Sequence, residues 1–263
     1  MIEYQVSKYI ADATDKISIN DLAGAIEIMN NAIEIDPQIS EFYFIRGITY
    51  NEIKLYNLAL KDLSTAIQLN PEYELAYEWR STIMINLGGN AFNAFKDCEQ
   101  ALRLNSNNQQ AHFNLGKISH NLAIIYGGLT NLKAKEEYTK AINEYTKAAL
   151  INPHYTDAFY QRGEIWYTLE NYKKAINDYS KAIELCPPEK GYFSQTTINL
   201  YFKRGMAKYF RRDYDGAILD MNKAIELNPL PYPEAHQMRN DFKKIKKDQT
   251  IFSLFLSILK KYF

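Results

Sequence analysis

The side chains that most often carry out catalysis are few in this chain of 263 residues, and their spacing does not suit a reaction centre. The chain has four histidines: His112, His120, His154 and His236. His120 follows His112 by two helical turns and has no second ligand at a spacing typical of zinc sites. Glu136 and Glu137 are expected on a solvated helix face, where neither carboxyl would gain the raised pKa that acid–base catalysis needs. The sequence therefore predicts no catalytic residues, no metal site and no enzymatic activity.

Two glycine pairs, Gly88-Gly89 and Gly127-Gly128, are the candidates for a phosphate-binding loop. Neither is followed by GK[ST], and neither belongs to a GxGxxG sequence. Cys98 and Cys186 lie far apart, at different positions of the repeats described below, and are predicted to be reduced small hydrophobic residues. We therefore expect no cofactor and no disulfide.

The charge balance argues against a nucleic-acid partner. The 31 basic side chains are matched by 31 acidic ones, so no net field attracts the chain to nucleic acid or anionic lipid. Aromatic residues are plentiful, but no basic stripe accompanies them. The first four residues do not resemble a signal peptide, and no apolar run approaches the roughly 20 residues that span a bilayer. These observations predict a soluble cytoplasmic protein that binds no nucleic acid.

The elements that would position any functional residue are set by a repeated stretch of sequence. Six copies occur: AIEIMNNAIEIDP at 25–37, ALKDLSTAIQLNP at 59–71, AFKDCEQALRLNS at 94–106, AINEYTKAALINP at 141–153, AINDYSKAIELCP at 175–187 and AILDMNKAIELNP at 217–229. Two of the intervals are 34 residues and a third is 35. A period of this length is typical of a solenoid of stacked units, so one elongated domain is expected.

The copy at 156–187 indicates how a unit folds. Phe159, Arg162, Gly163 and Trp166 lie at spacings of three and four, along one side of a first helix. A second helix has Ala175, Tyr179, Ala182, Ile183 and Leu185 on its inner face. Pro187 ends this helix, because proline cannot continue the backbone hydrogen bonds. The small residues allow the two helices to approach closely where they cross.

These residues resemble the tetratricopeptide repeat family. The same pattern recurs as Tyr43, Gly47, Tyr50, Ala59, Leu63, Ala66, Pro71, and as Tyr201, Gly205, Ala217, Met221, Ala224, Pro229. The resemblance implies an all-α fold, a right-handed superhelical solenoid of antiparallel helix pairs with C-terminal capping helices. It covers an array over 1–231, with repeats at about 6–39, 40–73, 74–108, 109–155, 156–197 and 198–231.

Three departures from the period mark inserted residues. Repeat three has one extra residue near Gly88-Gly89-Asn90, and the loop at 188–193 adds about eight residues before repeat six. Repeat four, 109–155, is longer by 13 residues. Its first helix is expected to continue to Ile125, and its second to run from about Asn131 to Ile151. Two helices that are merely longer are favoured over an additional docking site.

The C-terminal part is expected to contain two helices. Residues 232–247 form a capping helix over repeat six, and residues 248–263 form an apolar helix. The apolar helix could cap or fold back on the array, associate with a second copy, or lie on a membrane surface. A cap is favoured over self-association, and self-association over membrane attachment.

The resemblance also implies a binding surface, since the first helices of tetratricopeptide arrays line a concave groove. Aligned by the glycine position, the groove residues are Phe44, Asn51, Trp79, Phe113, Asn114, Lys117, Tyr160, Gln161, Glu164, Phe202, Lys203 and Tyr209. Aromatic rings supply contact area, and amides can bond a peptide backbone. The sequence predicts a scaffold or adaptor that binds a peptide segment or helix of a protein partner here. The alternative is that several of these rings only contact the neighbouring repeat.

One branch of the family can be tested residue by residue. Co-chaperone members hold a C-terminal carboxylate with a clamp of lysine, arginine and asparagine side chains. The matching positions in repeats three to five are Glu78, Thr82, Asn114, Asp157 and Gln161, and only Asn114 fits. Glu78 and Asp157 would repel a carboxylate. The chain is therefore predicted not to be of the carboxylate-clamp type.

Overall fold

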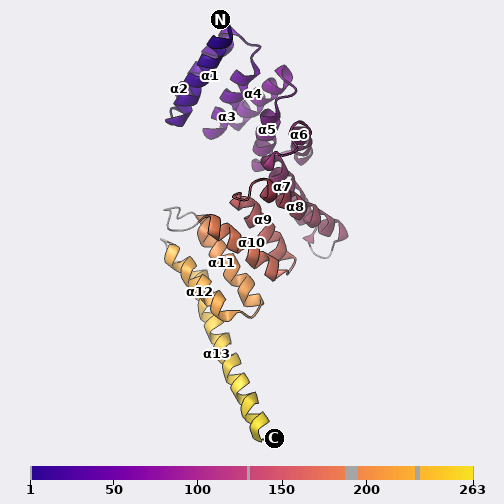
Figure 1. The fold of residues 1–263 in the computed structure, drawn as a ribbon, viewed down its shortest axis with the longest axis vertical. Helices are drawn as coiled ribbons and strands as arrows, with labels where there is room; N and C mark the ends of the chain where they lie inside the picture. The colour runs from indigo at the N-terminus through magenta and orange to yellow at the C-terminus, as the bar shows by residue number, and fades with distance from the viewer. Residues whose placement is uncertain (1, 129–130, 187–194, 229–231, 263) are drawn as a thin grey trace. The chain divides into compact units, whose positions relative to one another are not determined.

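The computed structural model describes residues 2–128, 131–186, 195–228 and 232–262, and describes side-chain surroundings for 4–128, 131–186, 196–228 and 232–250. Thirteen helices and no strands occur in these ranges (Figure 1). The helices are α1 (Ile2–Ser18), α2 (Leu22–Ile35), α3 (Ser40–Glu52), α4 (Tyr56–Leu69), α5 (Glu74–Asn86), α6 (Ala91–Leu104), α7 (Gln109–Ile125), α8 (Leu132–Ile151), α9 (Thr156–Thr168), α10 (Tyr172–Leu185), α11 (Gln195–Phe210), α12 (Tyr214–Leu227) and α13 (Pro233–Tyr262). The predicted all-α class is confirmed.

The helices divide into two compact units, Met1–Ile125 and Tyr126–Phe263. In the first unit α1 pairs with α2, α3 with α4, and α5 with α6. In the second unit α9 pairs with α10 and α11 with α12, and α13 packs on α12. Within each unit, the pairs are antiparallel and stack on one another, as the repeat predicts. The division falls between α7 and α8, inside the repeat that carries the 13-residue insert.

Short turns and polar caps set the ends of the helices. The turn from first to second helix contains a residue with positive φ, for example Lys54 at 63° and Gly88 at 63°. Asp21 and Asn90 then cap the second helices that follow them by accepting backbone N–H bonds. At the other end, Asn70 is extended just before Pro71, because proline disfavours helical backbone in the preceding residue. The same local rules therefore build each pair.

Small residues bring the paired helices into close contact. Gly163 of α9 faces Tyr179 of α10, and a Cβ at Gly163 would lie 2.8 Å from Tyr179 Cε1. Gly205 of α11 and Met221 of α12 repeat this relationship, with a distance of 2.9 Å to Met221 Cε. Ala182 of α10 is fully buried, as expected for a residue at a close contact. The predicted role of the glycine position is thereby confirmed for Gly163.

Repeat four has the longer helices that the sequence predicted. α7 ends at Ile125, and α8 starts after Asn131, which caps it, and ends at Ile151. Between them Gly127 and Gly128 have φ values of 89° and 73°, a conformation that favours glycine. The loop predicted at 188–193 lies outside the described residues.

The C-terminal part differs from expectation, because one continuous helix, α13, replaces the two helices predicted at 232–247 and 248–263. No glycine or proline interrupts the sequence between Glu234 and Tyr262, so nothing in the local sequence breaks the helical backbone hydrogen bonds. Early in α13, Ala235 and Phe242 are buried against Ala217 and Met221 of α12. This half of α13 covers repeat six, as predicted for a cap. The side chains of 251–262 lie outside the described residues.

Candidate interaction surface

An arginine on the first helix of four repeats ties each helix pair together. Every one of these guanidinium groups donates two hydrogen bonds of 2.6–2.9 Å to an aspartate on the second helix of the same repeat. The pairs are Arg46–Asp62, Arg80–Asp97, Arg162–Asp178 and Arg204–Asp220. Bidentate bonds between charged groups of this kind are strong and geometrically specific.

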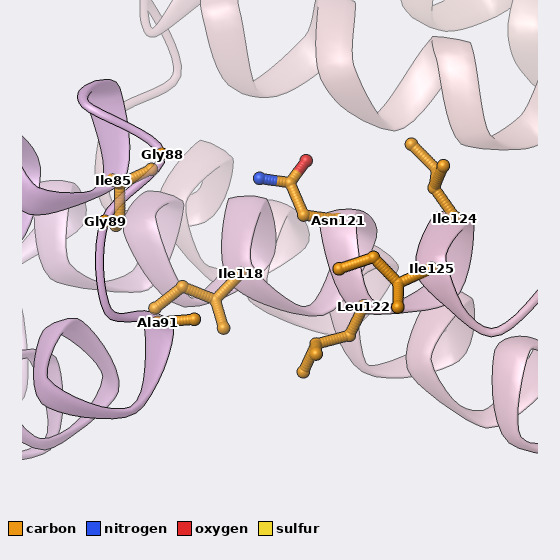
Figure 2. Close-up of a pocket in the computed structure, with 9 residues that line it drawn as sticks. All are labelled: Ile85, Gly88, Gly89, Ala91, Ile118, Asn121, Leu122, Ile124 and Ile125. Carbon is orange, nitrogen blue, oxygen red and sulfur yellow. The ribbon is translucent and has the colours of Figure 1, made fainter.

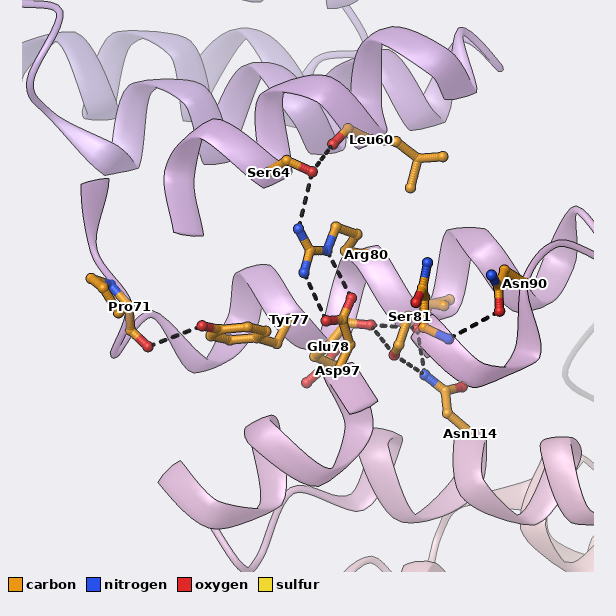
Figure 3. Close-up of polar contacts among 12 residues, drawn as sticks. Leu60, Ser64, Pro71, Tyr77, Glu78, Arg80, Ser81, Asn90, Asp97 and Asn114 are labelled. Atoms are coloured by element: carbon orange, nitrogen blue, oxygen red, sulfur yellow. Dashed lines mark hydrogen bonds and ion pairs between the residues drawn. The ribbon is translucent and has the colours of Figure 1, made fainter. Parts of the chain in front are cut away.

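The same arginines also reach back to the preceding repeat. Their Nη1 atoms donate at 2.7–3.1 Å to side-chain oxygens of the second helix before them. The acceptors are Asn30, Ser64, Thr146 and Ser180, respectively. Figure 3 shows one such set, in which Arg80 lies between Ser64 and Asp97. We call these four arginines with their partners the arginine ladder.

The ladder was missed in the sequence, although a signal for it exists. Each arginine directly precedes the small residue of the repeat, and the aspartate follows 16 or 17 positions later. Arg162 was expected on the same side of the first helix as Gly163, but its bond to Asp178 was not predicted. The regular spacing of unlike charges would have sufficed to predict the bridge.

In the first unit, Asn114 is a structural residue rather than an exposed ligand. Its side chain is almost entirely buried, with 1 % of the residue exposed. The Nδ2 atom donates to Ser81 Oγ at 3.0 Å and to Thr82 Oγ1 at 2.8 Å (Figure 3). The Oδ1 atom accepts a hydrogen bond from Gln110 at 3.0 Å. The one residue that matched the carboxylate clamp is therefore used inside the fold.

The predicted aromatic residues of the first unit also pack mainly inward. Phe44 is buried and its ring lies 4.8 Å from that of Tyr73. Phe113 is buried, and Trp79 packs half-buried against the core of α1–α5. Lys117 donates to Asn86 Oδ1 at 3.0 Å, and Asn51 is half-buried. Phe44 and Phe113 are thus largely shielded from solvent.

The first unit places two carboxylates beside one amide. Asn108 Nδ2 donates to Glu78 Oε2 at 2.7 Å and also bonds Glu74 Oε1. Burial raises the pKa of the Glu78 carboxyl, the Asn108 hydrogen bond opposes that rise, and the charge of Glu74 adds to it. This local electrostatic cost was not visible in the sequence, because Asn108 lies 30 residues after Glu78 and 34 after Glu74.

In the second unit, the predicted residues of α9 and α11 are half-buried, and an ion pair joins the two helices. Lys203 Nζ lies 2.8 Å from Glu164 Oε2, with side-chain exposures of 34 % and 22 %. Glu164 Oε1 accepts a hydrogen bond from Tyr179 OH at 2.5 Å, which fixes its carboxylate. Gln161 lies one turn before Glu164 and is half-buried, and its amide has no hydrogen-bond partner within the described ranges. We call Tyr160, Gln161, Glu164, Phe202 and Lys203 the first-helix face.

The aromatic members of this region differ in accessibility. Tyr160 lies 6.4 Å from the Tyr179 ring, and burial raises its pKa to about 12. Phe202 packs against Tyr232 at 5.5 Å. Tyr209 stacks on Phe242 of α13 at 4.4 Å and is therefore part of the contact with the cap rather than of an open surface.

An apolar pocket of about 350 Å³ lies in the first unit, between the α5–α6 turn and the last turns of α7 (Figure 2). Its lining residues are Ile85, Gly88, Gly89, Ala91, Ile118, Asn121, Leu122, Ile124 and Ile125. Leu122 and Ile125 belong to the α7 extension, so the insert of repeat four shapes this surface.

Of the residues considered first for catalysis, His112 has a structural role. His112 is buried, and its Nε2 lies 3.3 Å from the Ser106 carbonyl oxygen, which fits the predicted packing role. Burial raises the pKa of the Cys98 thiol to about 12, so the thiol stays protonated at neutral pH. Over the described ranges, no three His, Cys, Asp or Glu side chains gather where a metal ion could be held. No described helix has the length and apolar character needed to span a bilayer.

Comparison with known proteins gives matches to one type of repeat. Family models described as tetratricopeptide repeat match residues 156–188 and 198–229. Serine/threonine-protein phosphatase 5 of Rattus norvegicus is 30 % identical over 100 residues, which is 38 % of this chain. The match spans only 20 % of the phosphatase, so its activity is not carried over to this chain.

Solved structures show the same fold over most of the chain. The pilF protein of Pseudomonas aeruginosa has a TM-score of 0.72 at 13 % identity, covering 89 % of this chain and 96 % of its own. YrrB, described as a TPR protein with an unusual peptide-binding site, has a TM-score of 0.52 at 24 % identity and covers 68 % of this chain and 85 % of its own. Together with the stacked antiparallel pairs and the recurring glycine contact, these matches show that the chain is a tetratricopeptide repeat protein.

Proposed function

We propose that this protein is a non-enzymatic scaffold that binds a peptide segment or helix of a partner along the first-helix face. Tetratricopeptide repeats are generally protein–protein interaction modules. The observation that carries the proposal is the free amide of Gln161 beside the fixed Glu164–Lys203 pair. An amide can donate to and accept from a peptide backbone at once, and the ion pair joins the first helices of two repeats beside it.

The arrangement suits an extended ligand more than a small molecule. The side chains come from α9 and α11 and are half-buried, so their polar groups are presented with restricted side-chain motion. Holding the Glu164 carboxylate with Tyr179 and Lys203 reduces the entropy lost on binding. The peptide-binding site named in the description of YrrB supports the same use of the fold. The free cysteines Cys98 and Cys186 suit a reducing compartment such as the cytoplasm.

The test is a selection of peptides from a display library on the full chain, followed by affinity measurement on variants. Gln161→Ala combined with Lys203→Ala should weaken the selected peptides at least about tenfold, since each buried polar contact is worth about 1 kcal/mol. Leu219→Ala is the matched control, because Leu219 is 67 % exposed on the second helix α12. Equal affinity for the double variant and the wild type, with unchanged melting, would reject the first-helix face as the binding surface.

A second candidate function rests on the length of α13. Lys246 and Gln249 still bond α12 residues, Asp215 and Tyr214, and the helix continues to Tyr262. The sequence of 251–259 is mainly apolar, and Lys243, Lys244 and Lys247 before it are exposed. These features suit attachment to a membrane surface, or self-association through this helix.

Flotation with anionic and neutral liposomes, with and without 248–263, tests the membrane alternative. Sedimentation of the same pair over a range of concentrations tests self-association. Flotation that truncation abolishes would favour attachment, whereas a concentration-dependent dimer lost on truncation would favour self-association.

A further inference from the structure

The first four turns of α13 occupy the place of a first helix in a seventh repeat. Ala235 and Phe242 are buried, four positions before and three positions after Arg239. Ala158 and Ile165 of α9 are buried at the same positions relative to Arg162. α13 packs on α12 as α11 packs on α10. Arg239 therefore stands in the register of the arginine ladder.

Arg239 keeps the backward contact of the ladder but lacks its carboxylate. Its Nη1 lies 3.5 Å from Asn222 Oδ1 of α12, as Arg204 Nη1 contacts Ser180 of α10. Its Nε atom is shielded from solvent and has no hydrogen-bond partner in the described part of the chain. Its Nη2 lies 3.3 Å from Nδ1 of His236, a residue of the same helix. The two N–H groups that bind aspartate in four other repeats are thus not used for that purpose here.

No aspartate stands at the spacing from Arg239 that the other arginines of the ladder use. In the ladder the aspartate follows its arginine by 16 or 17 residues, and here those positions are Phe255 and Leu256. Residues 249–263 contain no acidic side chain. An unsatisfied buried donor on a charged group is costly, so a carboxylate beside Arg239 would be favourable.

We propose that Arg239 binds the side-chain carboxylate of an aspartate on an amphipathic helix of a partner protein, which packs along α13 where a second helix would otherwise lie. Exposed His236 and Lys243 lie one turn on either side of Arg239 on the same face, and they complement an acidic helix. The bound carboxylate accepts hydrogen bonds from Nε and Nη2 of Arg239, and the His236 ring moves away. This surface is separate from the first-helix face.

The repeats themselves indicate what the partner helix looks like. In α10, Asp178 has the buried alanines Ala175 and Ala182 three positions before and four positions after it. The glycine position of α13 is taken by Asn240, and at Gly163 even a Cβ would lie 2.8 Å from the tyrosine ring that follows the aspartate. The partner must therefore carry a small residue after its aspartate.

Repeat three provides the precedent for such a pair. There Ser81 replaces glycine, and Cys98, a small residue, follows Asp97 on the facing helix. The expected partner sequence therefore has an aspartate followed directly by a small residue, with one alanine three positions before the aspartate and another four positions after it. α6 has this form at Ala94, Asp97, Cys98 and Ala101.

The probe is a helix-stapled, fluorescent peptide with the sequence of residues 90–105, in which serine replaces Cys98. Its affinity for the full-length chain is measured by fluorescence anisotropy, beside the same peptide with Asp97→Asn. We expect the aspartate peptide to bind about tenfold or more tightly than the asparagine peptide, since the bonds are charge-assisted and bidentate. Arg239→Lys should abolish this preference, because lysine has no planar fork. Arg211→Lys, at an exposed turn, is the matched control and should preserve it.

Equal binding of the two peptides would overturn the proposal, as would an undiminished preference in a folded Arg239→Lys variant. A dimer of the full chain that Arg239→Lys dissociates would assign the guanidinium to a second copy and overturn the assignment to a partner protein. The Gln161→Ala, Lys203→Ala variant should keep the aspartate preference that Arg239→Lys loses. That result would show that the Arg239 site is separate from the first-helix face.

Discussion

Asn114 on α7 donates a 2.8 Å hydrogen bond to Thr82 on α5, so an amide aligned with a family's ligand-binding position joins two repeats instead. Its second bond, to Ser81 Oγ, completes the use of the amide nitrogen inside the fold. Substituting Asn114 therefore tests stability rather than binding.

Asn114→Ala should lower the free energy of unfolding by about 1–3 kcal/mol, because Ser81 and Thr82 lose a buried partner. Urea denaturation followed by circular dichroism measures the change. Asn107→Ala, at an exposed position in the preceding turn, should stay within about 0.5 kcal/mol of wild type. A neutral Asn114→Ala variant would show that the hydrogen bonds do not stabilise the repeat.

Asp178→Asn should be far more costly than the loss of a surface charge. The Arg162–Asp178 side chains are mostly buried, and removing the carboxylate charge leaves the guanidinium uncompensated. We expect a loss of about 3 kcal/mol in unfolding free energy. Glu184→Gln removes the exposed pair with Lys181 on the same helix and should cost less than about 0.5 kcal/mol. Similar losses for the two variants would contradict the structural role of the ladder.

Gly163→Ala should destabilise the chain by about 1–3 kcal/mol through the clash with Tyr179. Gly47→Ala should cost less, since the added Cβ would lie 3.2 Å from Leu63 Cγ. In a Tyr179→Leu background, the cost of Gly163→Ala should fall to that of Gly47→Ala. A double-mutant cycle measured by thermal and urea unfolding gives the coupling, and additive effects would contradict the contact.

Glu78→Gln should stabilise the protein at pH 7 and lose this advantage on acidification. A carboxyl with a raised folded-state pKa binds more protons when folded, so its contribution to unfolding free energy falls as pH rises through that pKa. Glutamine keeps an oxygen for Asn108 and removes the buried charge next to Glu74. Urea unfolding at pH 7 and at about pH 4, close to the usual pKa of a glutamate carboxyl, measures the difference. Glu72→Gln, at an exposed turn, is the control.

The repeat period carried the fold prediction because each unit is built from local signals. The alanines, the glycine at 163 and the prolines after the second helices all act within one 34-residue unit. The long helices of repeat four were predictable for the same reason, since Gly127 and Gly128 interrupt the chain between them. At the C-terminus no comparable breaker exists, and a change from charged to apolar composition misled us into dividing α13.

The candidate site was less predictable, because accessibility depends on neighbouring repeats. Position within a first helix does not distinguish Asn114, which Ser81 and Thr82 enclose, from Gln161, which is half-buried. Tyr209 was placed in the groove, yet Phe242 of the cap stacks on it. Such outcomes depend on side chains more than thirty residues away, which a single aligned position cannot report.

The arginine ladder has a gap that bears on how the chain unfolds. In repeat four its position is taken by Leu115, which cannot form either the forward or the backward hydrogen bond, and the boundary between the two units follows at Ile125. In arrays of this kind, contacts between neighbouring repeats make unfolding cooperative. The absence of the arginine hydrogen bonds in repeat four should therefore allow the two units to unfold separately. Calorimetry should therefore record two melting transitions, of which Asp62→Asn lowers one and Asp220→Asn the other.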